Sequence, residues 1–177
     1  TRFSEGIVHH IGQFTKGNFE ANETVNLFIN KERRLLHCRL HTAGHLVDVA
    51  MVNIGLEFQP TKGYHFADSP YVEYDGNIPA EERPQIIEKL DAELGKLTTE
   101  NTEVSAKVYL QKEELYDICS FVPDYIPEGK PIRVVNVAHY NCLCGGTHVK
   151  NISEIKTVSI KKIKVKGGKT RVSYTIE

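Results

Sequence analysis

Two short segments of the chain carry side chains that can bind a metal ion. The first contains His37, His41 and His45, each four residues from the next. In a helix, residues four apart lie one above the other, with Cβ atoms about 5–6 Å apart. The imidazoles of His41 and His45 can therefore face one ion, with His37 extending the row. The alternative for such a pair alone is packed or surface helical histidines.

The second segment places Cys144 and His148 four residues apart, with two glycines between them. Glycine lets the backbone turn tightly. Together the segments supply three imidazoles and a thiolate, the ligand set that zinc prefers. For this segment alone, a glycine turn beside a buried thiol is the alternative. Cys142 is the weaker ligand candidate, and we expect it to face away from Cys144.

Several familiar catalytic patterns are absent. The two histidines have the spacing of the metalloprotease pattern H-E-x-x-H, but Thr42 stands where the general base Glu belongs. The zinc deaminase signature, the G-x-S-x-G elbow and the glycine-rich phosphate loops are also missing. The sequence thus argues against a zinc peptidase of that type and against a nucleobase deaminase.

Three motifs in order resemble the editing domain of alanyl-tRNA synthetase and its free-standing AlaX relatives. They are H-x-x-x-H at 41–45, G-Y-H-F-x-D-x-P-Y-V-E-Y at 63–74, and C-G-G-T-H-V at 144–149. The editing domain of threonyl-tRNA synthetase is a more distant likeness. The resemblance covers residues 33–177 and implies a zinc-dependent hydrolase that clears serine or glycine from tRNA(Ala) in trans. By matching position, it implies the zinc ligands His41, His45, Cys144 and His148.

The implied substrate is an ester between an amino acid and the terminal ribose of tRNA. Zinc can lower the pKa of a bound water to about 7, or it can orient the substrate. Four protein ligands close a tetrahedral shell, whereas catalytic sites keep a position open, so the sequence leaves the role of the ion undecided. Thr42 and Thr147 are the candidate catalytic residues, because each lies beside a ligand histidine. Each hydroxyl could equally cap a turn or bond the backbone. For His65 and Asp68, structural hydrogen bonding is the stronger interpretation.

Two other functions remain open at this stage. One is a non-catalytic, zinc-stabilised module that binds tRNA or a protein. The other is an editing domain of the threonyl-tRNA synthetase type. The partner that the resemblance implies is the acceptor end of tRNA, most simply tRNA(Ala).

The apolar periodicity predicts the elements that must position these residues. Apolar residues at spacings of three, four and seven predict a helix over about 33–56 and a second over 79–100, regular from Pro84 onward. Strands are expected at 6–12, 23–30, 66–73, 105–110 and 132–137, and a hairpin at 157–176. We expect an α+β fold in which an antiparallel sheet packs against two main helices.

The chain divides into two predicted parts. Residues 33–177 form the zinc-binding editing domain, and residues 1–32 form a small β-rich subdomain. Free-standing relatives often carry a glycine-rich segment before the histidine helix, and residues 1–32 contain none. The subdomain is therefore expected to be truncated.

Local charge points to RNA. Seven basic residues and no acidic one lie between positions 156 and 171. On a hairpin these form a positive ribbon suited to a phosphate backbone, with Lys161, Lys162 and Lys164 as the candidate RNA-binding residues. The alternative is an edge strand whose lysines block edge-to-edge pairing.

Composition sets broad limits. The 177 residues carry 22 Lys plus Arg against 23 Asp plus Glu, which gives a net charge of −1. The overall charge therefore indicates no particular binding partner. No run approaches the roughly 20 apolar residues that a membrane helix needs, so no membrane partner is expected. Four cysteines, unevenly spread, are too few for a disulfide scaffold and favour a reducing compartment. We expect the protein in the cytoplasm.

Overall fold

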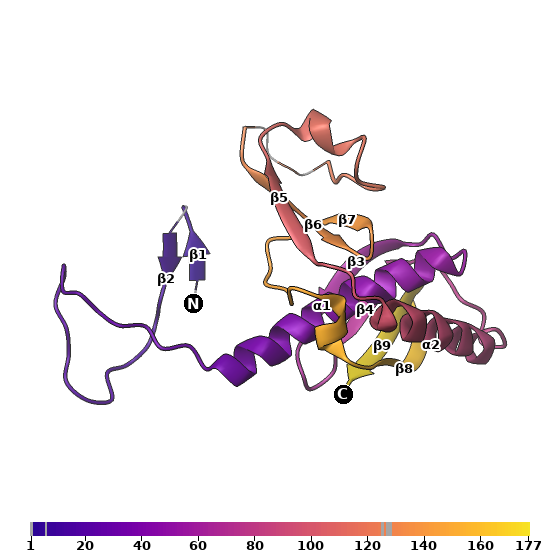
Figure 1. The fold of residues 1–177 in the computed structure, drawn as a ribbon, viewed down its shortest axis with the longest axis horizontal. Coiled ribbons are helices and arrows are strands. Elements are labelled where there is room, and N and C mark those ends of the chain that lie inside the picture. The colour runs from indigo at the N-terminus through magenta and orange to yellow at the C-terminus, as the bar shows by residue number, and fades with distance from the viewer. Residues whose placement is uncertain (1, 6, 125, 127–128) are drawn as a thin grey trace.

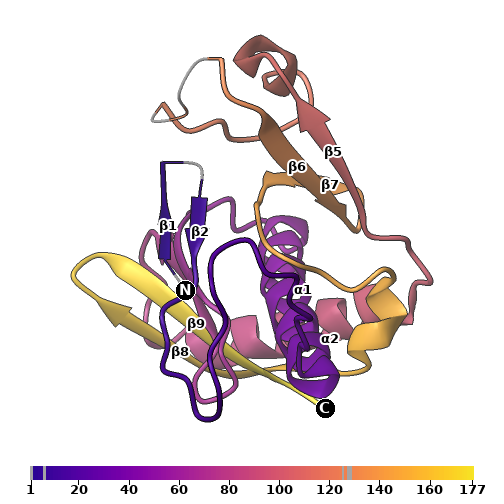
Figure 2. The ribbon, with the colours of Figure 1, turned by 90° about the vertical axis from the view of Figure 1, so that its left-hand side faces the viewer.

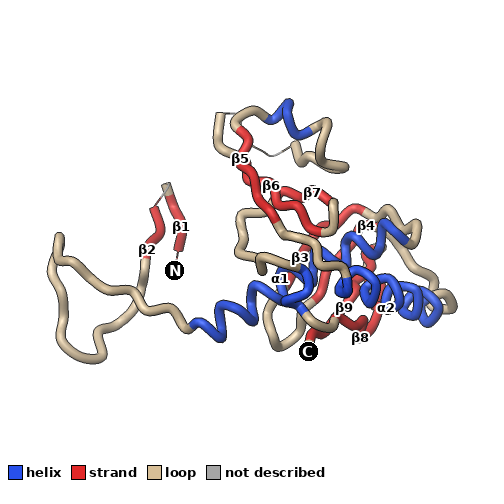
Figure 3. The backbone as a smooth tube through the Cα atoms, viewed as in Figure 1, coloured by secondary structure: helices blue, strands red, loops and turns tan. Residues whose placement is uncertain are grey.

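The computed structural model of the chain describes residues 2–5, 7–124, 126 and 129–177. Two long helices and nine strands make up most of the described residues (Figures 1 and 3). In chain order the elements are β1 (Arg2–Ser4), β2 (Ile7–His9), α1 (Lys31–Asn53), β3 (Gln59–Tyr64), β4 (Tyr71–Asp75), α2 (Arg83–Thr99), β5 (Ser105–Tyr109), η1 (Lys112–Leu115), β6 (Ile132–Val137), β7 (Tyr140–Leu143), η2 (Ile152–Ile155), β8 (Val158–Lys166) and β9 (Lys169–Ile176).

The strands form antiparallel sheets, as expected, but more than one. A four-stranded sheet has the order β3-β4-β9-β8, a three-stranded sheet has the order β5-β6-β7, and β1 pairs with β2. Helices α1 and α2 cover one face of the four-stranded sheet, and the three-stranded sheet lies on the other side of α1 (Figures 1 and 2). The α+β class is therefore confirmed, with α1 held between two sheets.

Strand alternation explains which face of the four-stranded sheet is buried. Val72, Val172 and Ile163 lie opposite one another on neighbouring strands and are buried against the helices. Residues next to them in sequence point to the opposite, solvent-facing side, because successive side chains of a strand alternate. That outer face carries Lys162, Lys164, Lys166 and Lys169 of the predicted ribbon.

Both helices agree with their sequence predictions to within a few residues. α1 begins at Lys31 because the Asn30 side chain accepts a hydrogen bond from the Arg33 backbone N–H, an N-cap contact. It ends before Gly55, whose φ of +84° suits glycine. α2 begins beside Pro84, the position that a fixed φ favours.

Two of the described hairpins close through tight turns with positive φ. Gly167 and Gly168 both have positive φ between β8 and β9, as the predicted hairpin requires. Ala138 and His139 also have positive φ and join β6 to β7. The sequence gives no turn signal for that second hairpin, so β7 was not predicted.

Other strand predictions are wrong. Residues 23–30 alternate in sequence but form no strand, because no partner strand lies beside them in the described part of the chain. From the predicted strand at 6–12 only Ile7–His9 forms, and Gly6 lies outside the described residues. The predicted strand at 66–73 is a turn followed by β4, and β3 precedes that turn.

Residues 10–30 leave the body as an exposed arm that ends at α1 (Figure 1). Their apolar side chains are exposed, with Phe28 at 93%. A β-rich stretch needs a third strand or a helix to pack against for stability. Among the described residues, nothing covers this arm. Neither of the described helices is long and apolar enough to cross a membrane.

Candidate metal centre

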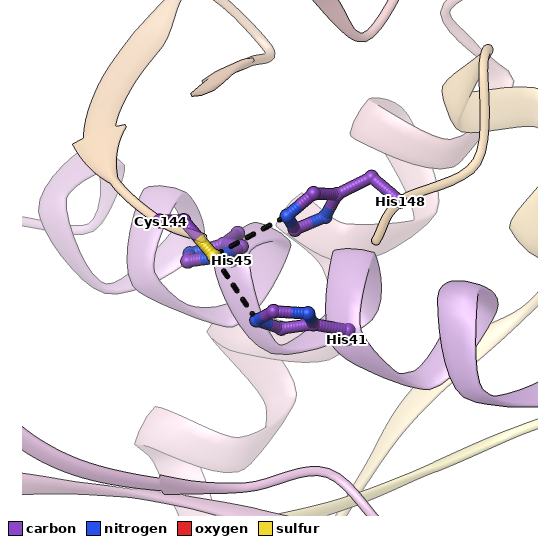
Figure 4. A group of neighbouring side chains, drawn as sticks. All are labelled: His41, His45, Cys144 and His148. Atoms are coloured by element: carbon purple, nitrogen blue, oxygen red, sulfur yellow. Dashed lines mark hydrogen bonds between the residues drawn. The ribbon is translucent and has the colours of Figure 1, made fainter. Parts of the chain in front are cut away.

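The histidine row lies along one side of α1. His41 and His45 are half-buried, while Ala43, Leu46 and Val47 on the other sides of the helix are fully buried in the core. Core packing therefore orients the helix so that both imidazoles face the segment after β7 (Figure 4). The i, i+4 spacing then brings their ring centroids to 5.1 Å.

The Cys144–His148 loop is held in place by one arginine. The Arg133 guanidinium donates from Nη1 to the backbone oxygens of Cys144 and Gly146, at 2.8 Å each. Arg133 lies on β6, next to β7 in the three-stranded sheet. This brace sets the loop against α1. Nothing in the sequence near residue 133 indicated it, because the contact depends on strand pairing.

The four predicted ligands converge. The donor atoms of His41, His45, Cys144 and His148 all lie within 4.8 Å of one another. Cys144 Sγ lies 3.4 Å from His41 Nε2 and 3.4 Å from His148 Nε2 (Figure 4). With zinc bonds of about 2.3 Å to sulfur and 2.0–2.1 Å to nitrogen, tetrahedral geometry separates such donors by about 3.5 Å. The donor types and spacings therefore fit a zinc ion.

Glycines make room for the histidine rings. A Cβ at Gly146 would lie 2.1 Å from His41 Cε1, and one at Gly44 would lie 2.3 Å from His65 Cε1. Gly63 is equally close to His65, at 2.3 Å from Nε2. Two of these glycines lie within the H-x-x-x-H and C-G-G-T-H motifs. Their role is to let a backbone approach an imidazole.

Electrostatics around the sulfur favour the thiolate. Burial raises the pKa of the Cys144 thiol, but hydrogen bonds from His148, His41 and His45 outweigh burial and lower that pKa to about 3. Burial also lowers the pKa of His45, yet Asp48, Cys142 and Cys144 reverse this and raise it well above 6.5. Thiolate is the form in which cysteine binds a metal.

Thr42 holds His148 in orientation. Its side chain is fully buried, and Oγ1 donates to the Cys38 carbonyl at 2.9 Å. The same oxygen accepts from the Val149 backbone N–H at 3.2 Å and lies 3.2 Å from His148 Nδ1. Since its one proton is used, Oγ1 accepts from Nδ1–H, which leaves His148 Nε2 free to face Cys144. These contacts favour the backbone-bonding alternative for Thr42.

Removing the Thr42 hydroxyl is expected to weaken zinc binding. Thr42→Val leaves His148 Nδ1–H without an acceptor, and such supporting partners contribute about 10–100-fold in metal affinity. Thr42→Ser keeps the hydroxyl and should bind zinc nearly as tightly as the wild type. Competition with a chromophoric chelator measures both constants. Equal affinity of Thr42→Val and the wild type would contradict the role.

His45 and His65 also have buried partners. Asp48 Oδ2 lies 3.4 Å from His45 Nδ1, and its other oxygen accepts from the Tyr74 hydroxyl at 2.7 Å. His65 Nδ1 lies 2.7 Å from the Tyr174 hydroxyl, which itself donates to the Leu40 carbonyl at 2.8 Å. The structural interpretation of His65 is thus confirmed.

His65 stays uncharged beneath the ligands. Burial and the neighbouring charges of His41 and His45 lower its pKa to about 3. Its ring stacks on His41 with centroids 4.9 Å apart.

Asp48 could have been found from sequence, because it lies three residues after His45 on the same helix face. Tyr174 gave no such signal.

Cys142 lies closer to the site than expected. Its sulfur is 3.4 Å from His45 Nδ1. The expectation that it faces away from Cys144 is wrong, because residues two apart on a strand share a face. A cavity of about 190 Å³ opens beside it. The lining residues are His45, Asp48, Pro60, Phe121, Pro123, Tyr140, Asn141, Cys142 and Leu143.

The remaining predicted residues lie around the centre. His37 is outside the ligand group and contacts the Phe66 ring edge-on at 5.5 Å. Thr147 is exposed beside His148. Asp68 accepts from the Tyr64 hydroxyl at 3.2 Å, so its structural interpretation is also confirmed.

The three predicted RNA-binding lysines are exposed on β8. Lys162 pairs with Ser173, and Lys164 pairs with Arg171, so both point to the outer face of the four-stranded sheet. Lys161 is also exposed, at a register shift between Ile160 and Lys162. Lys162 and Lys164 therefore lie on the opposite side of the sheet from the helices.

Known proteins are similar to this chain in sequence. Residues 132–173 match the family described as the threonyl and alanyl tRNA synthetase second additional domain. The alanyl-tRNA editing proteins AlaX-M of Methanosarcina barkeri and Methanosarcina acetivorans are each 28% identical, over 98% of this chain and 72% of their own length. The alanine–tRNA ligase of Streptococcus mutans is 31% identical over 88% of this chain, which spans 18% of that ligase. The resemblance predicted from the three motifs is confirmed.

Proposed function

Because this chain is a relative of the alanyl-tRNA editing proteins, we propose that it hydrolyses mischarged aminoacyl-tRNA in trans, with seryl- or glycyl-tRNA(Ala) as substrate. The observation that carries the proposal is the convergence of three imidazoles and one thiolate within 4.8 Å, beside a small cavity. We assign the activity to residues 33–177. The cytoplasm is the proposed location, and four free thiols fit its reducing conditions.

Zinc is the proposed cofactor, held by His41, His45, Cys144 and His148. When bound, it would supply a Lewis acid for the ester carbonyl or a water of lowered pKa. The protein side of the site is prearranged by Thr42 on His148, Asp48 near His45 and Arg133 on the cysteine loop. Such supporting contacts keep ligand rings oriented.

The cavity beside His45 and Cys142 suits a small aminoacyl group. Its volume of about 190 Å³ is below the roughly 300–1,000 Å³ of typical small-molecule pockets. Serine and glycine are small enough to enter. Selection of serine over alanine requires a hydrogen bond to the serine hydroxyl, because an alanyl ester would leave the buried partner of that hydroxyl unpaired. Acceptance of glycine would instead follow from its small size. Thr147 is the proposed residue for direct contact with substrate or water, because its side chain is exposed next to His148.

A deacylation assay tests the function. The zinc-loaded protein is mixed with seryl-tRNA(Ala), glycyl-tRNA(Ala) and correctly charged alanyl-tRNA(Ala), and the remaining ester is measured over time. We expect loss of the seryl or glycyl ester and preservation of the alanyl ester. Seryl- and glycyl-tRNA(Ala) that stay charged at high protein concentration would refute the proposal.

The outer face of the four-stranded sheet, which carries Lys162 and Lys164, is called the lysine face below. It is the proposed contact for the tRNA backbone. Changing Lys162 and Lys164 together to Glu should weaken tRNA binding and reduce the salt slope by about one per lost phosphate contact. Lys89→Glu, on the exposed side of α2, is the matched control. Filter binding across a range of salt concentrations measures the slope. An unchanged slope in the double variant would remove this face from the interface.

A non-catalytic zinc module is the second candidate function. It is favoured by one observation: all four donors belong to the protein, and closed sets of four are typical of structural zinc sites. Zinc removal would then unfold the domain, since a structural site couples binding to folding. Circular dichroism after chelation, read beside the deacylation assay, distinguishes the two. An editing activity of threonyl type has less support, because the relatives named above are all alanyl proteins.

A further inference from the structure

A row of aromatic rings runs from His37, next to the candidate metal centre, toward the lysine face. The rings of Phe66 and Tyr64 have centroids 4.9 Å apart, and Tyr64 stacks on Tyr71 at 5.6 Å with an interplanar angle of 14°. The Arg171 guanidinium carbon lies 4.0 Å from the centre of the Tyr71 ring, a cation–π contact. These four residues are called the aromatic strip below.

The strip begins one helical turn from the nearest predicted ligand on α1. Phe66 contacts His37, which lies one helical turn before His41. Between Tyr64 and Phe66 in sequence, His65 turns inward and stacks on His41 at 4.9 Å. The His65 side chain thus points toward the metal centre, whereas the side chains of Tyr64 and Phe66 point away from it.

The strip then crosses the outer face of the four-stranded sheet. β3 and β8 are the two edges of this sheet, so three strand spacings separate them, or about 14 Å. Along two rows of this face, Tyr64 pairs with Tyr71, and Arg171 pairs with both Glu73 and Lys164. The aromatic residues Tyr64 and Tyr71 therefore lie on β3 and β4, and most of the cations lie on β8 and β9, with Lys62 on β3 as the exception.

Exposure and charge make this face suited to a nucleic acid. Phe66 is 53% exposed, whereas Tyr71 is 9% exposed beneath Tyr64 and Arg171. The Glu73 carboxylate is already paired with Arg171 at 3.0 Å. The acids at this face are Glu73, Asp75 and Asp68, whose carboxylate accepts from the Tyr64 hydroxyl. The exposed cations outnumber these three acids, and they are Lys62, Lys162, Lys164, Lys166, Lys169 and Arg171.

We propose that the aromatic strip binds the unpaired 3′ end of tRNA, with a base stacked on Phe66 and phosphates on the cations beyond it. The proposal rests on the function proposed above and names the surface that delivers the ester to the metal centre. Aromatic rings beside a basic surface are how proteins bind single strands without reading sequence. A purely apolar partner would leave the surrounding lysines unpaired.

Binding of two uncharged RNA hairpins tests the strip. One ends in the unpaired 3′ nucleotides of an acceptor stem, and the other is blunt. Fluorescence anisotropy is expected to show that the wild type prefers the overhang. Phe66→Ala should bind the overhang about tenfold more weakly, as expected for one lost stacking contact, and bind the blunt hairpin unchanged. Phe66→Tyr keeps a ring and should behave as the wild type.

Two further variants complete the design. Phe66→Leu retains apolar packing on Tyr64 and should show the same loss as Phe66→Ala, even if the alanine variant folds poorly. Tyr116→Ala removes an aromatic side chain that is 60% exposed directly after η1, and it should leave binding of both hairpins unchanged. Equal overhang binding by Phe66→Leu and the wild type would overturn the proposal, as would a wild type that does not prefer the overhang. Because no ester is present, failure here is separate from failure of deacylation.

Discussion

The Cys144→Ala protein is expected to lose zinc and, with it, deacylation of seryl-tRNA(Ala). In the wild type, Cys144 Sγ lies 3.4 Å from both His41 Nε2 and His148 Nε2, so this sulfur links the loop to α1. Loss of a supporting partner alone costs about 10–100-fold in metal affinity, and loss of a ligand should exceed 100-fold. Metal analysis after dialysis and the deacylation rate are the two measurements.

Cys119→Ala is the matched control for this variant. Cys119 is also buried, but it packs with Leu115, Ile132 and Val134 in a separate apolar cluster, away from the four ligands. Its substitution should leave zinc content unchanged. Stoichiometric zinc bound by Cys144→Ala with wild-type affinity would show that the donor set is wrong.

The second large effect is expected from a single methyl group. Gly146→Ala places Cβ about 2 Å from the His41 ring, far inside van der Waals contact, so either the ring or the loop must move. The Arg133 contact to the Gly146 carbonyl resists movement of the loop. We therefore expect displacement of His41 from the donor group and a loss of zinc affinity of about 10–100-fold, comparable to loss of a supporting residue.

Gly145→Ala provides an unusually close comparison. A Cβ at Gly145 would have no atom within 4 Å, so the variant adds the same methyl group one residue away without a clash. Zinc titration of the two variants side by side isolates the steric effect from any change in backbone flexibility. If both bind zinc equally well, the role of Gly146 is refuted.

The group of side chains that could hold a metal ion could be predicted from sequence, because ligand types and local spacing define it. Four-residue spacing on a helix aligns His41 with His45 whatever surrounds the helix. The motif order then joined Cys144 and His148 to the same site. The end of α1 and the start of α2 were predicted from Gly55 and Pro84, which act through neighbouring backbone groups. The Asn30 cap, which starts α1 two residues before the predicted position, was found only in the structure.

The supporting residues were decided only by tertiary structure. Arg133 reaches the cysteine loop because β6 pairs with β7, and the turn at Ala138 and His139 that permits this has no sequence signal. Tyr174 meets His65 across 109 residues of chain. Such contacts depend on strand pairing, and the energy of pairing comes from packing rather than from local preference.

Residues 23–30 also show that local sequence pattern alone does not determine strand formation. Val25, Leu27 and Ile29 alternate as a strand does, yet no strand forms, because a β-strand needs a partner to satisfy its backbone groups. Local pattern thus determined which side chains could bind an ion. The arrangement of the sheets determined what holds those side chains and which surface leads to them.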